Sequence, residues 1–324
     1  MRVRSARLKT TTFSFAANDG IEVFVYRWWP GQEVAPRAVV QIAHGMGEHA
    51  GRYKRVAQRL TAAGYAVCAS DQRGHGRTAR TPADLGHLAD RDGWNKAVRD
   101  IYDLNRRIRG DNPALPIFLL GHSMGSLMVQ QYLLEHADTI DGAILSSSTC
   151  VLGLARRIVA AIARFERRRL GRRAQSPLLR WLLFGRFNRS FEPARTRYDW
   201  LSRDESRVDE YIADPRCGFV LSAQGMCDMF EALGLLTNPR SIARIPRGLP
   251  IYVFSGSRDP AHGELAGLRR LLATYERAGL ERVTHCLYED ARHEMFNETN
   301  SAEVCDDLIV WMDHCLRELA GPRV

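Results

Sequence analysis

The strongest constraint on the fold is an alternation between short apolar runs and amphipathic helical segments. The runs RAVVQIAHG (residues 37–45) and PIFLLG (116–121) are almost wholly apolar and end at a glycine, as buried strands do. The segment YKRVAQRLTAAG (53–64) has apolar residues at helical spacing, and GIEVFVYRWWP (20–30) alternates like an antiparallel strand. Strands that alternate with helices form a parallel sheet covered by helices on both faces. The pattern therefore predicts an α/β protein with a mostly parallel sheet.

The alternation is interrupted once, in the middle of the chain. From about residue 150 to about residue 240 the sequence is helical in pattern, rich in arginine and without a good strand. The strand pattern resumes with LPIYVFSGSRDP at residues 249–260. We therefore expect one sheet domain made of residues 1–149 and 241–324, with a helical insertion formed by residues 150–240.

The positive charge of the chain is concentrated in this insertion. Residues 151–200 contain thirteen arginines against three acidic residues, whereas the whole chain carries a net charge of +9. A basic patch attracts nucleic acid, anionic lipid or acidic partners. It is also typical of a solvated helical face in an arginine-rich chain. We expect no nucleic-acid partner, and both peripheral contact with an anionic membrane and a plain solvated face stay open.

The composition is that of an ordinary globular chain. With 324 residues, 45% of them hydrophobic, it is long enough to bury a core without disulfides. Its seven cysteines are odd in number and contain no CxxC pair, which favours a reducing compartment. The N-terminal sequence has no apolar run of signal-peptide length, and no run of about 18 apolar residues occurs. We therefore expect a cytoplasmic protein.

A G-x-S-x-G motif at residues 121–125 lies between a predicted strand and a predicted helix. This context places Ser123 at the tip of a sharp, strained turn, with its hydroxyl projecting from the sheet edge. Gly121 and Gly125 lack side chains that would collide with their neighbours, and the positive end of the following helix points at the site. The motif therefore predicts that Ser123 is a nucleophile.

A serine nucleophile needs a base, and in this architecture the acid and the histidine follow the serine in the sequence. Asp259 follows a predicted strand, and His293 lies between the last predicted strand and the last helix. We predict that Ser123 attacks, His293 transfers the proton, and Asp259 orients His293. Other candidates are less well placed. The acids Glu289 and Asp290 lie beside the histidine loop, and His285 lies inside a predicted strand. His314 lies in the terminal helix, and His262 is too close to Asp259 in the sequence.

The segment AHGMGEHAGRY (43–53) has two histidines, His44 and His49, five positions apart. This spacing matches neither zinc motif, and the glycines fit neither phosphate-binding pattern, so we expect no metal. The segment follows an early strand, where the second donor of an oxyanion hole is found. We predict that the backbone N–H groups of Met46 and Met124 hold the oxyanion, and that the two histidines are scaffolding.

Seven segments of the chain occur in the following order: HGMGEHAGRY, DQRGHGRT, GHSMGS, DWLSRD, DPRCGF, SGSRDP and RHEMFNE. Together they resemble the monoacylglycerol lipase and lysophospholipase group of serine α/β-hydrolases. The resemblance implies an α/β-hydrolase fold with about eight strands, a helical cap over the site, and no metal or organic cofactor. It implies hydrolysis of carboxylic esters, and it places Glu48 and Arg52 at the glycerol head-group end; a salt-bridged loop is the alternative for these two residues.

The insertion departs from this group because it is more basic. Four apolar residues fall on one face of its first helical segment, which would suit either a helix on an anionic bilayer or a helix packed on the core. We expect a serine ester hydrolase that cleaves monoacyl lipids such as monoacylglycerol. The alternatives are a lysophospholipase, a medium-chain carboxylesterase and, more remotely, a non-catalytic membrane-binding protein. The four residues are Ile158, Val159, Ile162 and Phe165.

Overall fold

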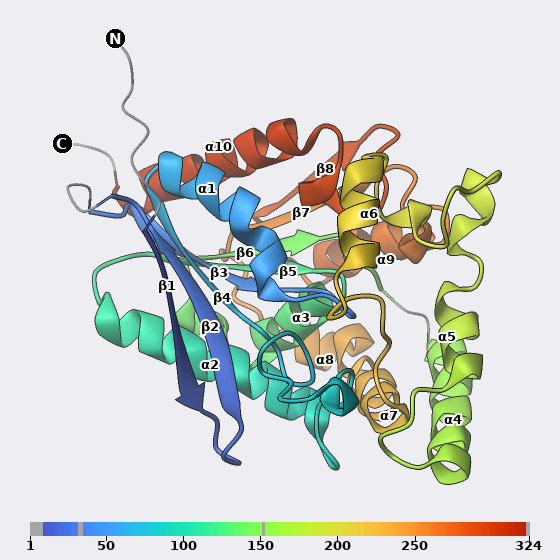
Figure 1. Cartoon of the computed structure of the whole chain (residues 1–324). Helices are drawn as coiled ribbons and strands as arrows, with labels where there is room; N and C mark the ends of the chain where they lie inside the picture. The colour runs from blue at the N-terminus through green and yellow to red at the C-terminus, as the bar shows by residue number, and fades with distance from the viewer. Residues whose placement is uncertain (1–8, 32–34, 151–152, 322–324) are drawn as a thin grey trace.

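A mostly parallel sheet of eight strands runs through the molecule, in the order β1-β2-β4-β3-β5-β6-β7-β8 (Figure 1). The computed structural model describes residues 9–31, 35–150 and 153–321. β1 pairs antiparallel with β2 and β2 with β4, and all the other pairs are parallel. The strands are β1 (Lys9–Ala16), β2 (Glu22–Trp29), β3 (Ala38–Ala43), β4 (Tyr65–Ser70), β5 (Ile117–His122), β6 (Gly142–Ser146), β7 (Ile251–Gly256) and β8 (Val283–Tyr288).

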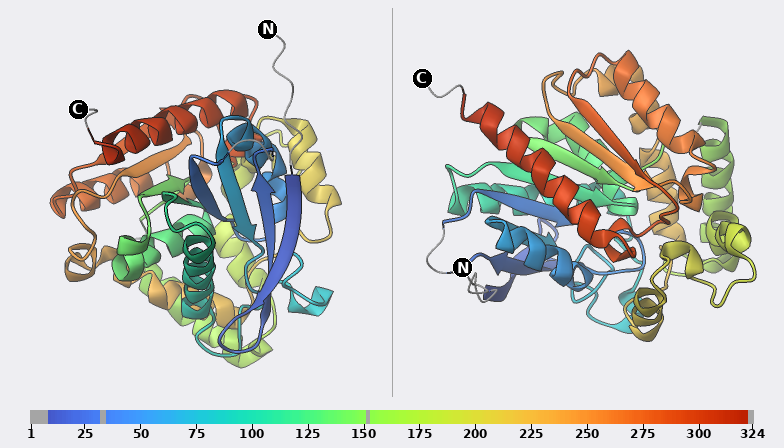
Figure 2. Two further views of the ribbon diagram at one scale, coloured as in Figure 1. Left: turned by 90° about the vertical axis from the view of Figure 1, so that its left-hand side faces the viewer. Right: turned by 90° about the horizontal axis from the view of Figure 1, so that it is seen from above.

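Helices cover both faces of the sheet, as the alternation predicts. Figure 2 shows α10 lying across one face, which it shares with α1, while α2, α3 and α9 contribute to the core on the other face. Successive strand residues feed the two cores: Val39 faces α2 and α3, and Val40 faces α1 and α10. These helices are α1 (Lys54–Ala62), α2 (Gly93–Asp111), α3 (Met124–His136), α9 (Ala266–Arg277) and α10 (Ser301–Leu319).

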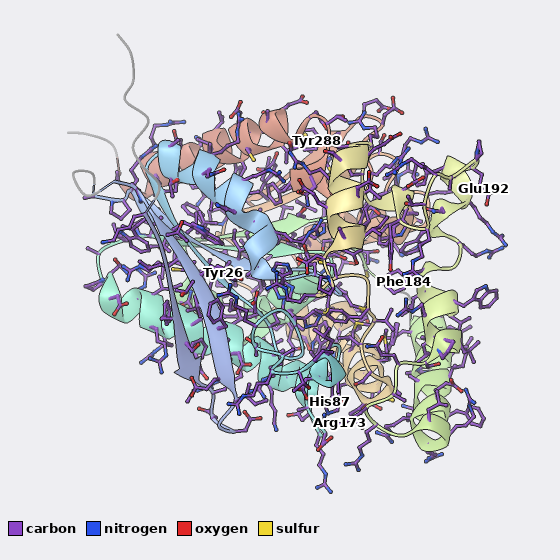
Figure 3. All side chains as sticks on the ribbon, in the orientation of Figure 1. Tyr26, His87, Arg173, Phe184, Glu192 and Tyr288 are labelled. Atoms are coloured by element: carbon purple, nitrogen blue, oxygen red, sulfur yellow. The ribbon has the colours of Figure 1, made fainter. Side chains whose placement is uncertain are left out.

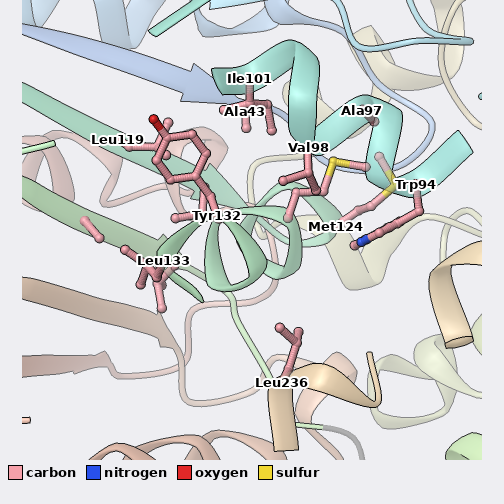
Figure 4. Close-up of a cluster of buried hydrophobic side chains, with 14 of the residues drawn as sticks. Ala43, Trp94, Ala97, Val98, Ile101, Leu119, Met124, Tyr132, Leu133 and Leu236 are labelled. Carbon is pink, nitrogen blue, oxygen red and sulfur yellow. The ribbon is translucent and has the colours of Figure 1, made fainter. Parts of the chain in front are cut away.

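The core beneath α2 and α3 reaches the end of the sheet that carries the candidate site. Figure 4 shows Trp94 and Val98 of α2 beside Met124, the first residue of α3. All three side chains are buried. Close packing of this kind holds the start of α3 in one position relative to the sheet.

Between β6 and β7 the chain leaves the sheet and forms a helical insertion. We propose that residues 150–240 are a cap over a core made of residues 1–149 and 241–324. α4 packs on α7, and α7 packs on α2, so the inner part of the insertion joins the main core. α4 and α5 form its outer edge (Figure 1). The helices of this region are α4 (Gly153–Leu170), α5 (Pro177–Phe184), α6 (Glu205–Ala213), α7 (Ala223–Ala232) and α8 (Pro239–Ile242).

The apolar stripe expected on α4 is divided between two environments. Val159 and Ile162 pack against the core, whereas Ile158 and Phe165 are more than half exposed. The buried face of the helix is formed by small residues and one glutamate, Glu166, rather than by the stripe. The helix therefore packs on the core and still presents large apolar side chains to solvent.

Strand β1 forms one edge of the sheet. The sequence pattern indicates no strand before residue 20, yet β1 pairs along all of its residues with β2. Most residues of β1 are exposed, so it lacks the alternation that marks a half-buried strand.

None of the helices in the described ranges combines the length and the apolar character needed to cross a bilayer.

Candidate active site

The turn between β5 and α3 carries Ser123 in an unusual backbone conformation. Its φ of 51° and ψ of −117° lie in a region that residues with a side chain rarely adopt. Its N–H donates to the Ser146 carbonyl at 3.0 Å, which ties the turn to β6. A Cβ atom on Gly125 would lie 2.1 Å from the Ala43 carbonyl oxygen, so only glycine fits there. The turn is thus held sharply by its surroundings, and it exposes the Ser123 hydroxyl to a cavity.

Three side chains from separate loops meet in one hydrogen-bonded chain. His293 Nε2 lies 2.8 Å from Ser123 Oγ, and His293 Nδ1 lies 2.8 and 2.9 Å from the two Asp259 oxygens. Asp259 also caps a short 3-10 turn, accepting the Ala261 N–H at 2.9 Å. This is the arrangement that proton transfer from a serine requires. The rival groups Glu289, Asp290, His285 and His314 are exposed.

Burial and charge act in opposite directions on the acid and the base. Burial alone would raise the pKa of Asp259, but the neighbouring imidazoles of His293 and His262 hold it well below its usual value. Burial alone would lower the pKa of His293, but the Asp259 carboxylate raises it above its usual value. The acid therefore stays ionised at neutral pH, and the base is supported in its protonated form.

The loop after β3 brings Met46 to the cavity beside Ser123 and Met124. The Met124 N–H is at the first position of α3, where helix N–H groups have no acceptor within the helix. Next to Met46, Gly47 has a φ of 66°, and its carbonyl accepts the Gly218 N–H at 2.9 Å. The insertion therefore holds the loop that contains Met46.

Glu48 lies in the same loop and is almost fully buried. Its Oε1 accepts the Gly45 N–H at 2.6 Å and the Tyr53 hydroxyl at 2.9 Å. Its Oε2 accepts from Arg52 at 2.8 Å, and Arg52 also binds Glu294 through both of its terminal nitrogens. Glu48 lines the cavity, whereas Arg52 is not among the described residues that line it. The salt-bridged loop considered in the sequence analysis is thus present, and Glu48 alone of the pair reaches the cavity.

The two histidines of this loop are engaged in scaffold contacts. His44 Nε2 accepts the Gln72 N–H at 2.9 Å, so its Nδ1 carries a proton and donates to the Gly45 carbonyl at 2.8 Å. Burial lowers the pKa of His44 to about 3, which keeps it neutral. His49 Nε2 lies 2.8 Å from Asp214, a residue of the insertion. Both side chains therefore fix the loop.

One group of potential metal ligands occurs among the described residues. The ligand atoms of His49, Asp214 and Cys217 lie within 4.8 Å of one another. The Asp214 oxygens, however, already accept hydrogen bonds from His49 and from Arg216. Because the carboxylate is occupied by these donors, we assign no metal to this group.

A cavity of about 670 Å³ lies between the insertion and the serine turn. Its polar end is formed by Glu48, His122 and Glu294, and two arginines of the insertion, Arg180 and Arg197, also line it. Figure 3 labels Phe184, an aromatic lining residue contributed by α5. Most of the other large apolar lining residues come from the insertion, among them Trp181, Leu183, Trp200, Phe219, Met229, Phe230 and Leu233.

Sequence reasoning missed two sets of contacts around the site. His262 lies 3.2 Å from Asp259 Oδ2, because the 3-10 turn folds it back toward the acid. The insertion also contacts the histidine loop, since the Glu294 N–H donates to the Leu201 carbonyl at 2.7 Å. The D-P-A-H sequence that begins at Asp259 was the available signal for the first contact. No local pattern indicates the second.

The family model for serine aminopeptidase, S33, matches residues 34–300. The monoacylglycerol lipase of Mycolicibacterium smegmatis is 31% identical over 301 residues, which cover 92% of this chain and 95% of that relative. The monoglyceride lipase of Rattus norvegicus is 29% identical and covers 94% and 91% of the two chains.

Solved structures of ester hydrolases are similar over nearly the whole chain. A carboxyl esterase from Bacillus coagulans, in complex with glycerol, has a TM-score of 0.86 at 24% identity and covers 95% of this chain and 99% of that one. A soluble variant of the monoglyceride lipase from Saccharomyces cerevisiae, bound to a substrate analog, has a TM-score of 0.71 at 20% identity and covers 97% of both chains. At these identities the likeness shows the α/β-hydrolase fold. Because the family model spans most of the sequence, the chain belongs to the serine aminopeptidase S33 family of α/β-hydrolases.

Proposed function

We propose that this protein is a serine carboxylic ester hydrolase that cleaves monoacyl lipids of the monoacylglycerol type. The observation that carries the proposal is the chain of hydrogen bonds from Ser123 through His293 to Asp259 beside a large, mainly apolar cavity. The monoacylglycerol lipase relatives support the same substrate class. The residue roles that follow are part of this proposal.

Each residue has one role in the proposed reaction. Ser123 Oγ attacks the ester carbonyl while His293 Nε2 takes its proton, and the N–H groups of Met46 and Met124 hold the resulting oxyanion. Each such donor is worth roughly 3 kcal/mol of barrier. His293 then returns the proton to the leaving alcohol, and a water molecule repeats the sequence to release the fatty acid. Asp259 holds the His293 Nδ1–H throughout.

The lining of the cavity suggests where each part of the substrate lies. An acyl chain suits the apolar region formed by Phe184, Met229 and Phe230, because burial of each CH₂ group contributes about 0.8 kcal/mol. A glycerol hydroxyl suits the polar end at Glu48, whose position Arg52 fixes. Arg52 is thus proposed to act on the head group through Glu48.

Release of fatty acid from a monoacylglycerol tests this function directly. We expect steady release by the full-length protein and loss of at least 1,000-fold in Ser123→Ala, because the nucleophile is gone. Ser190→Ala changes an exposed serine away from the cavity and serves as the matched control. If the full-length protein releases no fatty acid, or if Ser123→Ala releases it as fast, the proposed function is wrong.

A lysophospholipid is a second candidate substrate, favoured by the two arginines of the cavity. Among the described residues, the Arg180 guanidinium makes only long hydrogen bonds, to the Gly218 carbonyl at 3.3 Å and to Gln175 at 3.4 Å. Arg197 lies over the Tyr198 ring. Within the described residues, neither arginine has a carboxylate within ion-pair distance, so either could bind a phosphate group.

The ratio of lysophospholipid to monoacylglycerol turnover tests this second candidate. If Arg180 binds phosphate, Arg180→Gln lowers the ratio several-fold, a loss of about 1 kcal/mol. Arg186→Gln, an exposed arginine outside the cavity lining, should leave the ratio unchanged. An unchanged ratio in Arg180→Gln would remove Arg180 as the phosphate-binding group, and an unchanged ratio in the double variant Arg180→Gln and Arg197→Gln would remove the phosphate-bearing substrate from consideration.

We also propose peripheral contact between the outer edge of the insertion and an anionic membrane. Leu154, Phe165 and Trp181 are 73%, 60% and 61% exposed, although large apolar side chains are ordinarily buried. Leu154 and Phe165 lie eleven positions apart on α4 and therefore share one face with Ile158. Apolar side chains flanked by arginines are typical of helices that lie in a membrane interface.

A further inference from the structure

A second histidine, His262, contacts the carboxylate that orients the proposed base. Its side chain is completely buried, and its Nε2 lies 2.7 Å from Ser255 Oγ and 3.2 Å from Asp259 Oδ2. Ser255 Oγ in turn donates to the same Asp259 oxygen at 3.4 Å. Asp259 Oδ2 therefore faces three groups: His293 Nδ1, Ser255 Oγ and His262 Nε2.

The surroundings of His262 determine which of its nitrogens carries the proton. Its Nδ1 is buried and has no hydrogen-bond partner among the described residues. A proton on Nδ1 would leave a buried N–H unpaired and would place the Nε2 lone pair 3.2 Å from a carboxylate oxygen. A proton on Nε2 avoids both costs. Burial also lowers the pKa of His262, so at neutral pH the ring is a neutral donor.

We propose that His262 is a positioning residue that, together with Ser255, holds Asp259 Oδ2 and so limits how strongly Asp259 raises the basicity of His293. This inference rests on the proposed roles of Asp259 and His293. The His262 Nε2–H donates to Ser255 Oγ, and the Ser255 hydroxyl donates to Asp259 Oδ2. A carboxylate that accepts this additional hydrogen bond shares its charge with the donor, and it therefore attracts the His293 proton less strongly. The same contact fixes the rotation of the carboxylate, which sets the direction of the His293 ring.

Other charged groups also face His293, and they stay in place when only His262 is changed. His122 packs its ring 5.0 Å from the His293 ring, and the two glutamates that pair with Arg52 lie at the polar end of the cavity. Replacement of His262 therefore removes one contact to Asp259 and leaves the other titratable or charged groups around His293 unchanged. These groups are Asp259, His122, Glu48, Glu294 and Arg52.

The pH dependence of kcat/KM separates a positioning role from simple packing. The assay uses p-nitrophenyl butyrate with the full-length protein, His262→Leu and His262→Gln. Leucine fills the space but donates no hydrogen bond, so the acid limb should move to higher pH by about half a unit or more. The plateau should fall about tenfold, because the carboxylate is less well held. Glutamine keeps an N–H near the Nε2 position, so its acid limb should stay within about 0.2 units of that of the unchanged protein.

Thermal melting of each variant shows whether it is folded at the assay temperature. If His262→Leu is not folded, His262→Met, which is also apolar, takes its place. An acid limb that moves equally in the apolar and glutamine variants, or that does not move to higher pH in the apolar one, overturns the role of His262. Absence of Ser123-dependent turnover in the unchanged protein would instead overturn the proposed function itself.

Discussion

The inner and outer sides of the insertion are built in opposite ways. On the inner side, the Gly218 N–H binds the Gly47 carbonyl at 2.9 Å and the Ser222 N–H binds the Gly86 carbonyl at 2.7 Å. A Cβ atom on Gly47 would lie 2.3 Å from the Phe219 carbonyl oxygen. On the outer side, α4 and α5 carry large apolar side chains that face solvent.

This difference separates two tasks of one segment. The inner side touches the loop whose Met46 N–H is proposed to hold the oxyanion, so the position of the inner side should affect the proposed chemistry. Among the described residues, no hydrogen bond or ion pair joins α4 or α5 to Ser123, Asp259 or His293. Changes to the exposed side chains of the outer side should therefore affect how substrate arrives. The three predictions below test this separation with a soluble ester and with a membrane-bound one.

The largest effect on activity is expected from Asp259→Asn. Asp259 lies outside the insertion, so this variant gives the reference value for loss of the proposed chemistry itself. An amide carries no charge to support protonated His293, and it favours the wrong tautomer. We expect kcat on p-nitrophenyl butyrate to fall about 10⁴-fold. Circular dichroism should show an unchanged fold. A fall of less than tenfold would mean that Asp259 is not the acid of the site.

The intermediate effect is expected from Gly47→Ala, which breaks the inner side. The added methyl group meets the Phe219 carbonyl, and the φ of 66° is unfavourable for alanine, so the Met46 N–H should move. We expect kcat on the soluble ester to fall about 100-fold. Gly248→Ala is the matched control, because a Cβ atom there meets nothing within 4 Å. Equal activity of the two variants would show that the inner contact does not position the oxyanion donor.

The sequence was sufficient to predict the frame of this comparison but not its detail. The alternation of strands and helices predicted the parallel sheet, and the sheet is confirmed. The strand predicted before the motif at residues 121–125 and the helix predicted after it are confirmed as β5 and α3. Strand β1 was missed because exposed threonines give no alternating pattern. Edge strands of this kind are defined by their partner more than by their own burial.

The details of the site depend on contacts that no local pattern reveals. Arg52 and Glu294 pair across 242 positions, and their bond exists only because two loops meet at one edge of the sheet. The contact between His262 and Asp259 depends on a single 3-10 turn. The apolar stripe of α4 is partly buried and partly exposed because α7 packs on only one side of that helix. The spacing of apolar residues predicts that they share a face of the helix, but it does not predict which element packs on that face.

The smallest effect is expected from the outer side. The double variant Ile158→Ser and Phe165→Ser removes exposed apolar surface, so binding to anionic vesicles should weaken and turnover of a vesicle-borne monoacylglycerol should fall several-fold. Turnover of the soluble ester should stay within about twofold. Val310→Ser is the control, because it also removes exposed apolar surface but lies in α10, outside the insertion. An equal fall on both substrates would contradict the separation of tasks.

Labelling with a fluorophosphonate tests most directly whether Ser123 is the nucleophile. The reagent forms a covalent bond only with a serine activated by its surroundings, and peptide mass spectrometry then locates the adduct. We predict one adduct, on Ser123, which is absent in Ser123→Ala and forms at a similar rate in the double variant of α4. An adduct on another serine, or ester turnover without any adduct on Ser123, would contradict the account.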